Sequence, residues 1–133
     1  MAGRSLSLLL MLVSTGSAAA TLPLKPGTYV LADVPCTNPP LAALFTYDGR
    51  QFSYPHATGC RSIIQSHVGQ VYRVQTRCSA LGDGSRATPT TSLSSYVIAS
   101  ATRVSVGAGN GHARSTFRWC PAPRSPDGSQ LRY

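Results

Sequence analysis

The sequence predicts an all-β fold, a small antiparallel barrel or compact sandwich of about seven or eight short strands with two disulfides. Three observations lead to this prediction. Short runs of β-branched and aromatic residues recur along the chain, turn residues separate them, and no segment carries the apolar period of a helix. The chain has 133 residues and no internal repeat, which fits one small domain.

The N-terminal segment has the pattern of a secretory signal peptide. Arg4 gives a positive start, an apolar run from Leu6 to Val13 is interrupted only by a serine, and small residues end at Ala20. The run is too short for a transmembrane helix, which needs about 20 apolar residues. We therefore expect residues 1–20 to be removed and the product to be periplasmic or secreted, with no transmembrane segment in the remainder.

The rest of the chain divides into a domain and a tail. Residues 21–120 hold all four cysteines and the strand-like runs, so we expect one disulfide-stapled β domain. Residues 121–133 contain three prolines with serines and arginines, which predicts a disordered C-terminal tail.

The first strands follow from local pattern. Residues 27–32 read as a strand that ends before a rigid, proline-containing loop at 37–40. Asp48-Gly49, the preferred dipeptide of a type I′ turn, lies between runs 43–47 and 50–54. In a two-residue hairpin Phe45 faces Phe52, and Ala43 faces Tyr54.

A second hairpin suggests how the cysteines pair. Runs 62–67 and 70–75 flank a turn at Val68-Gly69, so the numbers of facing residues sum to about 137 or 138. Cys60 and Cys78 meet that condition if a small bulge or a three-residue turn fixes the register. This favours Cys60–Cys78 with Cys36–Cys120. The competing arrangement is Cys36–Cys60 with Cys78–Cys120.

The remaining elements lie between two glycine-rich or polar segments. Residues 79–92 are small and polar and predict a long loop. Residues 96–99 and 102–106 read as strands, followed by a flexible glycine-rich turn at 107–111. The last strand is 116–120, where alternation places Phe117 and Trp119 toward the core.

The charge of the chain is strongly positive. After residue 20 there are eleven basic residues, ten of them arginines, against four aspartates and no glutamate, a side-chain balance of +7. Such a chain attracts polyanions or acidic partners, and arginine binds phosphate and carboxylate in a bidentate manner. If the relevant strands are neighbours, the outer sheet face carries an arginine stripe; ordinary solvent-facing charge is the alternative interpretation. The candidate anion-binding residues are Arg61, Arg73, Arg77, Arg103, Arg114 and Arg118.

Signals for catalysis or metal binding are weak. The sequence has no nucleophile elbow, zinc-protease motif, phosphate-binding loop or Cys-x-x-Cys. The histidines His56, His67 and His112 lie in or beside expected turns, and Asp48 and Asp83 lie in turn contexts. We expect no catalytic residue, no metal and no cofactor.

These observations predict a non-catalytic exported binding module for an anionic envelope component or an acidic protein. Expected partners are an anionic polysaccharide, a lipid head group or an acidic protein; nucleic acid is not expected. One alternative is a secreted or periplasmic protein inhibitor of a hydrolase, which would use loop 37–40 or 82–85 as its contact. Another alternative is a carrier of a small apolar ligand inside the barrel.

Overall fold

The structure is a computed structural model that describes residues 21–109 and 114–121. The predicted signal peptide at 1–20, nearly all of the predicted tail and His112 lie outside the described residues. The all-β prediction with two disulfides is confirmed. The described elements are β1 (Gly27–Leu31), a 3-10 turn η1 (Leu41–Ala43), β2 (Leu44–Tyr47), β3 (Phe52–Ser53), β4 (Ala57–Val68), β5 (Val71–Leu81), β6 (Arg86–Ser100), β7 (Arg103–Ala108) and β8 (Arg114–Cys120).

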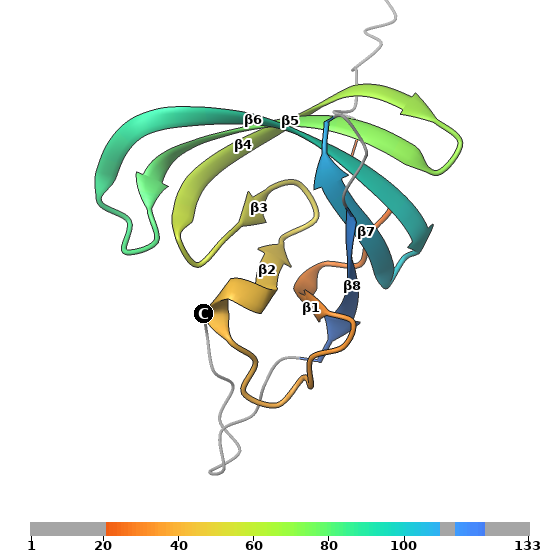
Figure 1. The fold of residues 1–133 in the computed structure, drawn as a ribbon. Helices are drawn as coiled ribbons and strands as arrows, with labels where there is room; N and C mark the ends of the chain where they lie inside the picture. The colour runs from red at the N-terminus through yellow and green to blue at the C-terminus, as the bar shows by residue number, and fades with distance from the viewer. Residues whose placement is uncertain (1–20, 110–113, 122–133) are drawn as a thin grey trace, which may run out of the picture.

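The strands form one antiparallel sheet that curls into a nearly closed barrel. Their order is β3-β2-β1-β8-β7-β6-β5-β4, so every neighbour in space is also a neighbour in sequence except the pair β1 and β8. The long strands β4, β5 and β6 arch over the shorter strands (Figure 1). Between β3 and β4 the barrel is joined by the Tyr54–Ala57 bridge and by the Gln51 Oε1 atom, which accepts the Ser62 backbone N–H at 2.6 Å.

Aromatic side chains fill the barrel interior. The rings of Tyr29 and Phe45 are stacked with centroids 5.2 Å apart, and the rings of Phe52 and Tyr96 are stacked at 5.1 Å. The one hydrogen of the Tyr29 hydroxyl is shared between the Lys25 and Ala101 carbonyls, which lie 2.7 and 3.0 Å from the hydroxyl oxygen. Burial raises the pKa of Tyr29 to about 12, and the nearby Tyr47 adds to this shift. The N-terminal leader contributes two further buried side chains, Leu22 and Leu24.

A second, smaller cluster lies on the outside of the barrel wall. Val30 and Leu44 pack there with Cys120, and the loop after β1 covers them. The Cys36–Cys120 disulfide holds that loop against β8, as predicted. The arrangement follows from strand alternation, because Val30 and Leu44 are paired residues whose side chains point away from the aromatic interior.

The predicted register of the Asp48 hairpin is wrong. Tyr47, not Phe45, pairs with Phe52, and the connection has four residues instead of two. The Asp48 side chain is the cause, because its Oδ1 accepts the backbone N–H groups of Arg50 and Gln51, both at 2.7 Å. Phe45 and Phe52 still touch diagonally, with ring centroids 5.6 Å apart.

The Cys60–Cys78 disulfide is confirmed, and the two cysteines lie directly opposite each other on β4 and β5. The register shifts between Ile64 and Ser66, which is the bulge that this pairing required. The turn itself falls one residue later than predicted, at Gly69-Gln70, with Gly69 at a φ of 58°.

The predicted long loop at 79–92 is not formed. Strand β5 continues to Leu81, and β6 begins at Arg86, so the connection is a tight turn. Asp83 stabilises this turn by accepting the Ser85 backbone N–H at 2.9 Å. The small polar composition misled the prediction, since threonine fits an extended strand well once a neighbouring strand supplies the hydrogen bonds.

Candidate functional site

Three of the predicted anion-binding arginines share one outer surface. Arg61 on β4 pairs directly with Arg77 on β5, and Arg73 lies four residues before Arg77 on the same strand. All three side chains are exposed, while the alternate residues Val74 and Thr76 are buried. We call Arg61, Arg73 and Arg77 the β4–β5 arginine face.

The strands that carry this face contain no acidic residue. The segments Ala57–Val68, Val71–Leu81 and Arg86–Ser100 contain four arginines and neither aspartate nor glutamate. Asp83 lies in the turn between two of them, and hydrogen bonds from the Ser85 side chain and backbone lower its pKa. The fourth arginine, Arg86, was missed because it falls in the segment predicted to be a loop; it is exposed at the start of β6, opposite Ala80.

The other three predicted residues lie on a different part of the wall. Arg103 is on β7, Arg114 and Arg118 are on β8, and Arg103 pairs with Arg118. Strands β6 and β7 separate β8 from β5. The condition for one continuous arginine stripe is therefore not met, and the predicted residues form two groups.

Arg118 is engaged in the fold. Its Nη2 donates to the Val34 carbonyl at 2.6 Å, and its Nη1 contacts Cys36 Sγ at 2.9 Å. It also donates through Nε to the Ala32 carbonyl at 3.4 Å. These contacts hold the loop over the outer cluster, so we leave Arg118 out of the arginine surface that is available to a ligand.

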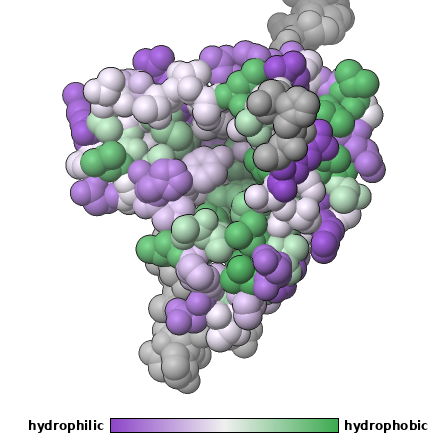
Figure 2. Space-filling model, viewed as in Figure 1, coloured by the Kyte–Doolittle hydropathy of each residue, from purple (hydrophilic) through white to green (hydrophobic). Residues whose placement is uncertain are grey.

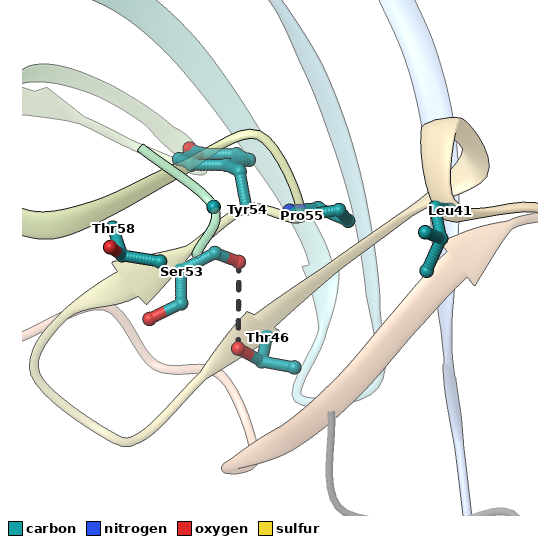
Figure 3. Close-up of a pocket in the computed structure, with 7 residues that line it drawn as sticks. Leu41, Thr46, Ser53, Tyr54, Pro55 and Thr58 are labelled. Atoms are coloured by element: carbon teal, nitrogen blue, oxygen red, sulfur yellow. Dashed lines mark hydrogen bonds between the residues drawn. The ribbon is translucent and has the colours of Figure 1, made fainter. Parts of the chain in front are cut away.

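A pocket of about 350 Å³ lies between residues of η1, β2 and β3 and the start of β4 (Figure 3). Hydroxyl groups of Thr46, Ser53 and Thr58 line it, and Thr46 donates to the Ser53 carbonyl at 3.4 Å. The Tyr54 hydroxyl is bonded to the Tyr96 hydroxyl at 3.2 Å. The other lining residues are Leu41, Pro55 and Gly82, so the lining includes no acidic residue, lysine, arginine or histidine.

The histidines and turn aspartates that the sequence analysis singled out do not form a metal-binding cluster in the described residues. His56 precedes β4 and His67 lies near its far end, so the two histidines are at opposite ends of a twelve-residue strand. Asp48 and Asp83 accept local backbone hydrogen bonds in their turns, as the sequence suggested. Within residues 21–109 and 114–121, no group of three or more histidine, cysteine, aspartate or glutamate side chains is placed to hold a metal ion.

Three further observations bear on location and relationship. In the part of the chain that the structure describes, no helix has the length and apolarity of a membrane span. The two disulfides are consistent with an extracellular or periplasmic location. No family model, curated protein or solved structure matches this chain.

Proposed function

We propose that this chain is an exported, non-catalytic binding module that recognises an anionic component of the cell envelope through the β4–β5 arginine face. One observation carries the proposal: Arg61 lies directly opposite Arg77 on an exposed sheet surface, with Arg73 on the same strand face. The proposed export rests on the signal-peptide pattern of residues 1–20 and on the two disulfides.

The pairing of two arginines has a physical cost without a ligand. Directly opposed like charges destabilise an antiparallel sheet, and no acidic residue of β4, β5 or β6 offsets the charge of Arg61 and Arg77. An anion that accepts hydrogen bonds from both guanidinium groups replaces this repulsion with charge-assisted bonds. The pair is therefore suited to a phosphate or carboxylate group.

The spacing favours a ligand with repeated negative charges. Arg73 and Arg77 are four residues apart, which corresponds to about 13 Å along an extended strand. Two anionic groups of one ligand match this backbone separation better than a single small anion does. A polysaccharide or a lipid surface presents several anionic groups at separations of this order, so it can occupy both positions together.

The test is capture of envelope components by the purified, oxidised protein at low and at high salt. We expect a glycan or lipid to be retained at low salt and released at high salt, because exposed charge contacts are screened. The variant Arg61→Gln/Arg77→Gln should lose capture. Its charge-matched control, Arg103→Gln/Arg114→Gln, should retain it. Equal loss in both variants would show that only net charge matters and would contradict the proposal.

A second candidate, a protein inhibitor of a hydrolase, is favoured by the geometry of loop 37–40. The Cys36–Cys120 disulfide and the Arg118 bond to the Val34 carbonyl hold the start of this loop, and Pro39 is buried. A contact loop ordered before binding loses little entropy on association. Salt-resistant capture of one hydrolase that is abolished when residues 37–40 are replaced by a glycine-serine segment would favour this function over anion binding.

A further inference from the structure

The β4–β5 arginine face continues into exposed apolar side chains. Val68 and Val71 pair across the end of the hairpin and are 79% and 37% exposed. Ile63, between Arg61 and the bulge, is 60% exposed. Figure 2 shows hydrophobic surface at this end of the β4–β5 hairpin, at the upper right of the view, next to hydrophilic side chains.

Cationic and apolar positions alternate along this face. Moving from the turn, the outward pairs are Val68 with Val71, Ser66 with Arg73, Ile63 with Gln75, and Arg61 with Arg77. Successive residues on one face of a strand are about 7 Å apart. Each pair that contains an apolar residue therefore lies within about 7 Å of a pair that contains an arginine. None of the residues in these four pairs is acidic.

The end of the hairpin is held in one shape. The rings of His67 and Tyr72 are stacked, with centroids 3.9 Å apart and planes at 12°. The His67 Nε2 atom is 2.6 Å from the Gly69 carbonyl oxygen, which fixes the ring against the turn. Val68 and Val71 are thus presented on a preformed surface, and binding through them requires little further ordering.

We propose that this face is seated on an anionic lipid bilayer, with Val68, Val71 and Ile63 in the headgroup region and the arginines on lipid phosphates. This inference rests on the proposed function and names its ligand. A soluble polyanion provides only the charge, whereas an anionic bilayer surface provides both negative charge and an apolar phase for the three aliphatic side chains. Charge complementarity calls for an anionic occupant, and the exposed Val68, Val71 and Ile63 beside the arginines favour a bilayer over a soluble polyanion.

The experiment uses cosedimentation of the purified, oxidised protein with phosphatidylcholine vesicles, with and without phosphatidylglycerol. Binding to dextran sulfate is measured in parallel as the soluble polyanion. We expect the wild type to bind the phosphatidylglycerol vesicles and the dextran sulfate. The variant Val68→Thr/Val71→Thr, which keeps β-branched side chains in the strands, should lose about tenfold in vesicle affinity and keep its dextran sulfate affinity.

Two controls make the result specific. Leu41→Thr changes an exposed aliphatic residue on η1, which is not part of this face, and should leave vesicle binding unchanged. Circular dichroism of every variant establishes that it is folded. Unchanged vesicle binding by Val68→Thr/Val71→Thr overturns the bilayer assignment, as does capture of an acidic protein through these valines in place of vesicles.

The two proposals fail in different ways. If the wild type binds dextran sulfate but not phosphatidylglycerol vesicles, the bilayer assignment is wrong and the arginine face still binds polyanions. If it binds neither probe, the proposed anion-binding function itself is wrong.

Discussion

Removing the Cys36–Cys120 disulfide should destabilise the domain more than removing Cys60–Cys78. The first closes a loop of 84 residues and the second a loop of 18. Loop-closure entropy then gives about 4.6 kcal/mol for the first bond and about 3.2 kcal/mol for the second, a difference of about 1.4 kcal/mol. Lost packing acts in the same direction, because Cys120 is buried against Val30 and Leu44 whereas Cys60 and Cys78 are half-buried.

The assay is urea unfolding of two matched double variants, Cys36→Ala/Cys120→Ala and Cys60→Ala/Cys78→Ala. Trp119, the only tryptophan of the chain, reports unfolding by fluorescence, and circular dichroism provides a second probe. With a slope of about 1–3 kcal/mol/M, the midpoints of the two variants should differ by roughly 0.5–1.4 M. A lower free energy of unfolding for Cys60→Ala/Cys78→Ala than for Cys36→Ala/Cys120→Ala would contradict the larger contribution of the longer disulfide loop.

Three other perturbations follow from the packing. Arg118→Lys should lower the free energy of unfolding by about 1.5–3 kcal/mol, because lysine cannot make the divergent contacts of the guanidinium group. The control Arg103→Lys, at an exposed position, should change the free energy of unfolding by less than about 0.5 kcal/mol. Equal effects of the two variants in chemical denaturation would contradict the role of Arg118. Gly27→Ala should destabilise the domain by about 1–3 kcal/mol. Gly27 has a φ of 143°, and an added Cβ would collide with the Trp119 ring. An unchanged melting temperature of the variant would contradict this expected destabilisation. The pKa of Tyr29 is raised from 10.0 to about 12, so its contribution to stability is fully present below pH 10 and is lost as the pH rises through 12. Burial also raises the pKa of Tyr47, Tyr54 and Tyr96, so ultraviolet titration of a Tyr29→Phe variant should keep a late phase whose amplitude is smaller by one tyrosine. An unchanged late amplitude would contradict the assignment.

The alternation of residues in sequence was sufficient to predict much of the arginine face. Arg73 and Arg77 have the same parity within one apolar-polar run, so their placement on one side of β5 follows from the period of a strand. The Cys60–Cys78 pairing followed from counting across a hairpin, and the bulge that it required is present. These features are local, because each depends on residues that are close in sequence.

The features that were missed depend on contacts between distant residues or on a single side chain. Arg118 has the pattern of a solvent-facing strand residue, but a loop about 84 residues earlier covers it and accepts its hydrogen bonds. The register of the Asp48 hairpin was set by hydrogen bonds of one aspartate, which a two-residue turn template does not include. The separation of the arginines into two groups depends on strand order, which residue alternation leaves open.

The most direct test of the central claim is the salt dependence of the affinity for dextran sulfate, measured for the wild type and two charge-matched variants. We expect Arg61→Gln/Arg77→Gln to weaken binding strongly and to flatten its dependence on salt, while Arg103→Gln/Arg114→Gln leaves both close to wild type. Identical affinities and salt slopes for the two variants would contradict the claim that the β4–β5 arginine face is the binding site.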